Sequence, residues 1–207
     1  MEGEYLIKQN INEMSYFRPR YKCCFIGPYG AGKTSFIRSV LGMSLDGVQT
    51  TLGIDFFTTS LSIHNTTVHI TLWDTAGADR YRSLMHSYVR DADIVFVMYD
   101  IMDQNAMSSV EHCFRDLESC KPSVVAVVGT KMDLGRCTHD LHGTIEPWAR
   151  QPWQIVTGVC SSRQPATTKK ILNRCLDLMV CVPNPQNSKP ISVRLTSVRT
   201  DPKKCCT

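Results

Sequence analysis

Residues 21–34 read YKCCFIGPYGAGKT, an apolar run that passes directly into a glycine-rich loop. The loop at residues 27–34 fits the pattern G-x-x-x-x-G-K-[ST], and residues 33–41 behind it have the apolar spacing of a helix. A buried strand, this loop and a helix in that order present unpaired backbone N–H groups and the positive end of a helix dipole to a phosphate. The stretch therefore predicts a phosphate-binding site in an α/β fold.

Within this loop we expect Lys33 to reach the outer phosphates of a nucleotide and the Thr34 hydroxyl to ligate Mg²⁺. The other loop residues expected to contact phosphate are Gly27, Tyr29, Gly30, Ala31, Gly32 and Ser35. The alternative is a glycine-rich turn that carries an exposed lysine, because the pattern also recurs by chance. The loop fits ATPases and kinases as well, so it does not identify the base.

Strands and helices alternate along the rest of the chain. Residues 55–63 and 68–73 alternate apolar and polar residues around His64-Asn65-Thr66, which is typical of a β-hairpin. Residues 94–100 and 124–130 are continuous apolar runs, as expected for strands buried on both faces of a parallel sheet. The remaining expected elements are helices at 106–118 and 168–180 and a last strand at 153–159. This order predicts an α/β domain with a mostly parallel, six-stranded sheet flanked by helices.

Length and charge suggest how the chain is divided. The 207 residues suit one domain, which we place at residues 21–182 behind an N-terminal extension at 1–20. The net charge is +4, and from residue 183 onwards five Lys or Arg residues stand against one Asp, so the tail carries the whole excess. A basic, proline-interrupted tail at 183–207 is predicted to be disordered.

The compartment is indicated by two absences from the sequence. We find no secretion signal and no apolar stretch near the ~20 residues of a membrane-spanning helix, which indicates a cytosolic chain with reduced cysteines.

The segment Trp73-Asp74-Thr75-Ala76-Gly77 ends a predicted strand. An Asp at a strand end beside the phosphates, here Asp74, can hold Mg²⁺ through its water shell. The Gly77 backbone N–H can bond a γ-phosphate and so report its presence. The alternative is an ordinary β-turn.

The segment Thr130-Lys131-Met132-Asp133 follows the next buried strand and bears on the choice of base. The Asp133 carboxylate can accept two hydrogen bonds, from the N1–H and N2–H₂ groups of guanine, a pair of donors that adenine lacks. The Lys131 stem can pack over the purine face. The alternative is a solvated charge pair after a strand. These residues predict GTP or GDP as the bound nucleotide and argue against an ATPase or nucleotide kinase.

The three segments at 27–34, 73–77 and 130–133 together resemble a Ras-like small GTPase over residues 21–182. The resemblance implies that Thr51 is the threonine of switch one (residues 50–54), whose hydroxyl joins Mg²⁺ only in the GTP state. It also implies that Thr130 belongs to the guanine site. The final guanine-contact loop is then formed by Val159, Cys160 and Ser161. Switch two is implied at residues 78–87.

Several segments resemble the Rab branch of this superfamily: LGIDF at 52–56, RYRSL at 80–84 and YVR at 88–90. The chain ends in KKCCT, and no Cys stands fourth from the end, so this is not a C-a-a-X box. Adjacent Cys205 and Cys206 resemble the Rab double-geranylgeranyl site, and two prenyl chains give stable membrane anchoring. The basic tail adds attraction to anionic lipid. The alternative is two idle thiols at a frayed end.

The Rab resemblance implies a GTP-hydrolysing switch in vesicle-mediated protein transport, held to the cytosolic face of intracellular membranes. It implies effectors, exchange factors and GDP-dissociation-inhibitor or escort proteins as partners, with a monomeric chain and no nucleic acid. Phe56, Trp73 and Tyr81 are candidate effector-facing residues, although each could equally belong to the core.

Departures from the family pattern concern catalysis. Ala78 stands where the family has a Gln that orients the attacking water, so of the two catalytic positions, Lys33 and Ala78, the second lacks its usual side chain. Tyr29 replaces a small residue and should crowd the arginine finger of an activating protein. We therefore expect slow hydrolysis, unless Asp79 or backbone groups position the water. The alternative function is a GTP-locked scaffold that recruits effectors.

A further departure concerns nucleotide binding. Leu45 replaces an aromatic residue that stacks on guanine in the family, which favours faster nucleotide exchange.

Overall fold

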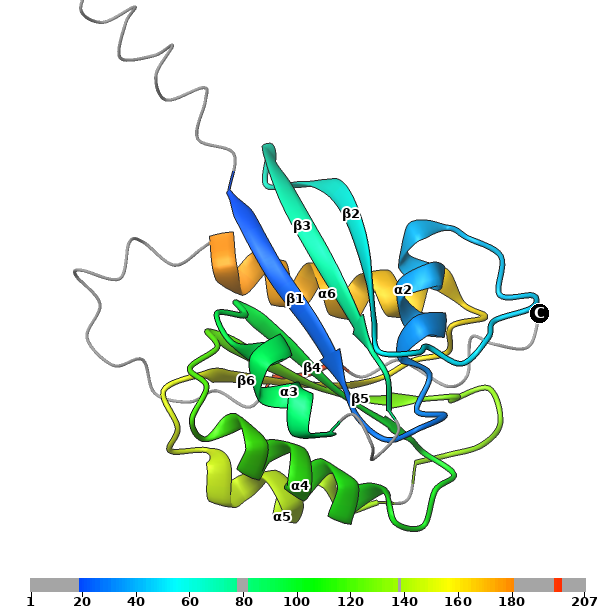
Figure 1. Cartoon of the computed structure of the whole chain (residues 1–207), viewed down its shortest axis with the longest axis vertical. Helices are drawn as coiled ribbons and strands as arrows, with labels where there is room; N and C mark the ends of the chain where they lie inside the picture. Colours follow the sequence, from blue (N-terminus) through cyan, green and yellow to red (C-terminus); the bar gives the residue numbers. More distant parts are fainter. Residues whose placement is uncertain (1–18, 78–81, 138, 181–195, 199–207) are drawn as a thin grey trace, which may run out of the picture.

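The computed structural model describes residues 19–77, 82–137, 139–180 and 196–198. In this part of the chain one twisted sheet has the strand order β2-β3-β1-β4-β5-β6-β7 and lies between two layers of helices (Figure 1). Strands β2 and β3 pair in antiparallel orientation, and every other neighbouring pair is parallel. The predicted α/β class with a mostly parallel sheet is confirmed.

The bounds of the elements agree closely with the sequence patterns. The strands are β1 (Arg20–Ile26), β2 (Ile54–Ile63), β3 (Thr66–Thr75), β4 (Ile94–Asp100), β5 (Val124–Thr130), β6 (Gln154–Val159) and β7 (Thr196–Val198). The helices are α2 (Lys33–Leu41), α3 (Arg82–Val89), α4 (Ala106–Leu117), α5 (Leu141–Ile145) and α6 (Pro165–Val180), with a 3-10 turn η2 (Glu146–Trp148). The sequence analysis gave no bounds for α3, α5, η2 or β7. The six expected strands are present, and β7 adds a short seventh strand from the tail, where no regular structure was expected.

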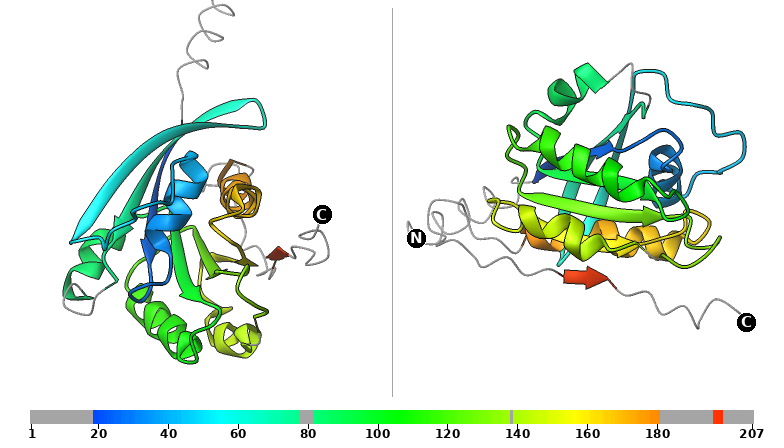
Figure 2. Two further views of the ribbon diagram at one scale, coloured as in Figure 1. Left: turned by 90° about the vertical axis from the view of Figure 1, so that its right-hand side faces the viewer. Right: turned by 90° about the horizontal axis from the view of Figure 1, so that it is seen from below.

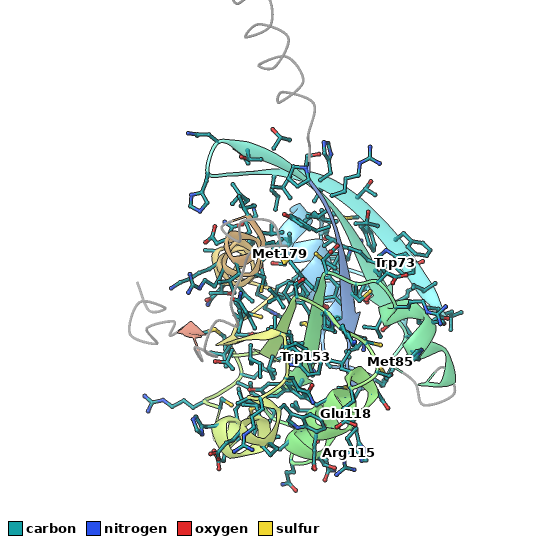
Figure 3. The ribbon with its side chains drawn as sticks, turned by 90° about the vertical axis from the view of Figure 1, so that its left-hand side faces the viewer. Trp73, Met85, Arg115, Glu118, Trp153 and Met179 are labelled. Carbon is teal, nitrogen blue, oxygen red and sulfur yellow. The ribbon has the colours of Figure 1, made fainter. Side chains whose placement is uncertain are left out.

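Two hydrophobic clusters cover the two faces of the sheet. One cluster packs under α2 and α6, and the other packs under α3, α4 and α5 (Figure 2). In Figure 3, Trp73 and Met85 lie on the second of these faces, where both pack against its cluster. The apolar runs of β4 and β5 supply both clusters, because their side chains are buried on both faces.

Three phenylalanines fix the start of α2 against the sheet. The Phe25 and Phe96 rings of β1 and β4 stack with centroids 4.5 Å apart, and the Phe36 ring of α2 packs at 5.6 and 5.7 Å from them. All three side chains are almost fully buried. Truncating one of them to alanine would cost about 3–5 kcal/mol of stability. This contact positions the loop between β1 and α2.

The parallel pairing brings the motif-bearing loops together at one edge of the sheet. Registers such as Phe25 with Asp74, Asp100 with Thr130 and Gly129 with Val159 align the carboxyl ends of the strands. Ligands of open α/β sheets bind at this edge. The loops that follow β1, β3, β5 and β6 are therefore neighbours, although they are far apart in the sequence.

Two further observations concern the cysteines and the helices of the described residues. Cys23, Cys24, Cys113, Cys120, Cys137, Cys160 and Cys175 are all free thiols. Of these, only Cys137 is not buried. Among the helices that the structure describes, none has the length and apolar character needed to cross a membrane.

Candidate nucleotide-binding site

The loop between β1 and α2 closes around the end of a lysine. Lys33 is only 6% exposed, and its Nζ atom donates hydrogen bonds to the carbonyl oxygens of Gly27 and Pro28, each at 2.9 Å. Burial lowers the pKa of the Lys33 ammonium to about 8. No side chain caps the N-terminus of α2, so its first N–H groups are available to an anion.

The predicted phosphate-binding residues fall where the pattern places them. They lie in this loop and the first turn of α2: Gly27, Tyr29, Gly30, Ala31, Gly32, Lys33, Thr34 and Ser35. Gly77, at the end of the segment after β3, approaches the same loop from the other side. A Cβ atom on Gly77 would lie 2.5 Å from both Lys33 Nζ and Pro28 O, so only glycine allows this approach. The two segments are thus in backbone contact around the phosphate end of the site.

Three oxygen-bearing side chains from separate segments meet beside the loop. The Thr34 and Thr51 hydroxyl oxygens are 2.9 Å apart, and they lie 2.6 and 3.0 Å from Asp74 Oδ2, to which both hydroxyls can donate. These are the three residues predicted to hold Mg²⁺, so the fold brings the whole predicted set together. Hydroxyl and carboxylate oxygens are the ligands that Mg²⁺ prefers.

The environment of Asp74 provides a test of this assignment. Asp74 is completely buried, and its Oδ1 atom has no hydrogen-bond partner among the described residues. Burial raises the pKa of the Asp74 carboxyl, while hydrogen bonds from Thr34 and Thr51 act in the opposite direction. An unpaired carboxylate oxygen in such a place is costly. A hydrated divalent cation would satisfy it, so these residues fit Mg²⁺.

At the other end of the site, Thr130 ties the loop after β5 to the phosphate loop. Its hydroxyl lies 2.9 Å from the Ala31 carbonyl oxygen and 3.0 Å from that of Tyr99, and Thr130 is 1% exposed. The Thr130 side chain is therefore committed to holding two segments in place. Lys131 has a left-handed backbone with φ of 62°, and its ammonium forms a 2.7 Å ion pair with Asp100.

The Asp133 carboxylate has a neighbour that the sequence analysis missed. Arg163 Nε lies 3.8 Å from Asp133 Oδ2, and the Arg163 side chain is 82% exposed. The Asp100 partner of Lys131 was also missed, although a carboxylate at the end of β4 is a usable signal, because β4 and β5 are parallel neighbours. Nothing in the sequence signals Arg163, since its loop position sets the contact.

The segment after β6 adjoins the loop after β5, as the resemblance implied. Cys160 O accepts a hydrogen bond from Met132 N at 3.1 Å, and Cys160 N donates to Gly129 O at 2.8 Å. The N–H of Ser161 donates to Thr167 Oγ1 at 3.1 Å. Cys160 and Ser161 are both buried, whereas Val159 is half-buried. The backbone N–H groups of Cys160 and Ser161 therefore already have partners inside the protein.

Comparison with known families agrees with this geometry. A sequence model of the Ras family matches residues 22–172, well over half of the chain. This chain belongs to the Ras family. Ras-family proteins are small GTPases that bind GTP and GDP, typically with Mg²⁺, and act through regulators and effectors. Of the functional residues predicted from the sequence of this Ras-family chain, Ala78, Asp79, Tyr81, Cys205 and Cys206 lie outside the described residues.

Proposed function

We propose that this Ras-family protein is a Rab-like GTPase that acts as a GTP/GDP-regulated switch in vesicle-mediated protein transport. Geranylgeranyl groups on Cys205 and Cys206 hold it to the cytosolic face of intracellular membranes. Its GTP form orders switch one and switch two, which then recruit effectors. The Rab-like segments at 52–56, 80–84 and 88–90 support this assignment over other branches of the family.

An aromatic pair next to switch one, of which Phe56 is exposed, carries the proposal. The Phe56 ring packs edge-on against the Trp73 ring, with centroids 4.6 Å apart, and Phe56 remains 56% exposed. Lys22 Nζ lies 3.9 Å from the Trp73 ring centroid. Leu52 of switch one is 70% exposed. A large exposed apolar side chain supported by a second ring is typical of a protein-binding surface. Phe56 thus supports an effector-facing role, whereas Trp73 is partly buried.

The membrane part of the proposal is tested on the C-terminus itself. The full chain is purified from eukaryotic cells, and intact mass with C-terminal peptide analysis is measured together with vesicle flotation. We expect two geranylgeranyl additions and flotation, and the Cys205→Ser/Cys206→Ser variant should lose both. The control variant Cys137→Ser, which makes the same substitution within the folded domain, should float like the wild type. Unmodified cysteines in the wild-type chain would contradict the membrane anchor.

Hydrolysis is tested in single-turnover conditions with Mg²⁺ and GTP. Because a methyl group at position 78 cannot orient water, we expect slow turnover and a clear gain in the Ala78→Gln variant. With an activating protein present, crowding of its arginine finger by Tyr29 would lower the stimulated rate by a further ~10³–10⁵. A wild-type rate equal to that of Ala78→Gln would refute the proposed role of this position.

A second candidate function is a GTP-locked scaffold that scarcely turns over. Ala78 favours it, and so does Tyr29, whose bulky side chain is 67% exposed at the phosphate loop. The nucleotide that copurifies with the protein separates the two candidates. Mostly GDP supports a switch that turns over, and mostly GTP supports the scaffold.

A further inference from the structure

Tyr29 connects the phosphate loop to switch one through its side chain. Its hydroxyl lies 3.2 Å from the hydroxyl of Thr50 in switch one, and either group can donate the hydrogen bond. Tyr29 follows Pro28 in the phosphate loop, while Thr50 is the residue just before the magnesium-binding Thr51. The Tyr29 side chain therefore reaches from the phosphate loop to switch one.

Three other hydrogen bonds, at Thr51 and Gly53, hold this stretch of switch one. The Thr51 hydroxyl lies 2.9 Å from Thr34 Oγ1 and 3.0 Å from Asp74 Oδ2. On the far side, Gly53 O accepts a hydrogen bond from Ala76 N at 2.8 Å. The Thr51 contact uses oxygens assigned to the cation, so it depends on the state of the metal site. The Tyr29–Thr50 contact involves neither a metal ligand nor a phosphate group.

We propose that Tyr29 is a positioning residue that fastens switch one to the phosphate loop in the GDP form as well as the GTP form. A nucleotide held by the phosphate loop can then leave only after this hydrogen bond breaks. Tyr29 slows nucleotide release and reduces the difference in mobility of switch one between the two forms. Its effect opposes the faster exchange expected from Leu45. The inference needs only the nucleotide binding of the Ras family and is independent of the proposed transport role.

The test measures release of a fluorescent GDP analogue from the full chain after addition of excess GDP and Mg²⁺. Tyr29→Phe keeps the ring and removes the hydroxyl, and Thr50→Val removes the other partner. An exposed neutral hydrogen bond predicts release about twofold to tenfold faster in each variant. The double variant should release no faster than the faster single variant, because both changes remove the same bond.

Matched controls make the same atomic changes elsewhere. Tyr21→Phe removes a hydroxyl that bonds Met179 O on α6, away from the loop, and Thr58→Val changes an exposed residue of β2. Both should release GDP at the wild-type rate. Thermal melting of the GDP-loaded variants checks that the fold is intact.

Hydrogen exchange of residues 48–53 provides the second readout. In the GDP-loaded wild type these amides should be nearly as protected as with a non-hydrolysable GTP analogue, and Tyr29→Phe should lose protection mainly in the GDP form. Release from Tyr29→Phe at the wild-type rate, multiplicative rates in the double variant, or unchanged exchange in the GDP form would each overturn the inference. A wild-type chain that fails to load GDP would overturn it as well, whereas absence of lipid would refute only the transport role.

Discussion

Replacing Gly77 with alanine should weaken the contact with the γ-phosphate without weakening nucleotide binding as a whole. The added Cβ would lie 2.5 Å from Pro28 O and 2.6 Å from Pro28 C, where ordinary contact begins at 3.4 Å. Lys33 Nζ, also 2.5 Å away, can move because it ends a flexible side chain, but the Pro28 carbonyl belongs to the backbone. The segment after β3 must therefore retreat by about 1 Å. Gly77 is not among the residues with positive φ, so steric contact rather than backbone strain is the cause.

A retreat of about 1 Å takes an N–H···O hydrogen bond from about 2.9 Å to about 3.9 Å, beyond a useful length. A hydrogen bond to a charged phosphate is worth about 1.5–3 kcal/mol, which corresponds to about tenfold to hundredfold in affinity. We expect Gly77→Ala to lose this factor for a non-hydrolysable GTP analogue and to keep its affinity for GDP. Isothermal titration with both nucleotides in Mg²⁺ measures the ratio of the two affinities.

Gly135→Ala is the matched control for this experiment. Its Cβ would meet only the flexible Met102 side chain, with Sδ at 3.0 Å. The ratio of GTP-analogue to GDP affinity should therefore stay at the wild-type value. If Gly77→Ala also keeps that ratio, or weakens both nucleotides equally, the Gly77 N–H does not report the γ-phosphate and the reasoning is wrong.

The remaining predictions concern the base, the metal and the thiols. Asp133→Asn places an amide donor opposite the donors of guanine. Two charge-assisted hydrogen bonds, worth about 3–6 kcal/mol together, should therefore be lost. Calorimetry should then show that xanthosine diphosphate, which has a carbonyl at C2, binds more tightly than GDP. An unchanged preference for guanine would exclude Asp133 as the selecting residue. Thr51→Ala should weaken the Mg²⁺ dependence of GTP-analogue binding but leave that of GDP binding unchanged, as measured by magnesium titration; equal effects on both would argue against a GTP-specific ligand. Burial raises the pKa of Cys24 and Cys160 to about 12, so almost no thiolate forms at pH 8. Among the cysteines that the structure describes, iodoacetamide should therefore label the half-buried Cys137 first, as read by peptide mass spectrometry. Early labelling of Cys160 would show that its loop opens.

Much of the fold could be predicted because its strands are simple patterns. Continuous apolar runs gave the bounds of β4 and β5 without error, and the helix behind the phosphate loop coincides with α2. The helix α3 was missed because it has only eight residues, although Met85 and Val89 follow an i, i+4 apolar repeat. The strand β7 was missed because its only signal, three residues pairing with β6, depends on the finished sheet.

The residues of the candidate site also fall into two groups, those that the sequence could predict and those that it could not. Lys33, Thr34 and Asp74 could be predicted from motifs, and Thr51 from the family resemblance, since the fold brings these segments to one edge of the sheet. The Arg163 neighbour of Asp133 and the Thr50 partner of Tyr29 could not, because loop conformation rather than periodicity decides which of these side chains meet.

The buried Thr130 hydroxyl has a consequence for the ligand as a whole. It lies within hydrogen-bonding distance of Ala31 in the phosphate loop and of Tyr99 at the end of β4, on the residue that opens the guanine-selecting segment. The predicted base and phosphate sites are therefore linked through one buried side chain, and the sheet sets the distance between them. A compound with a lengthened or shortened link between its purine and its phosphates should bind poorly, even when each half fits its own end of the site.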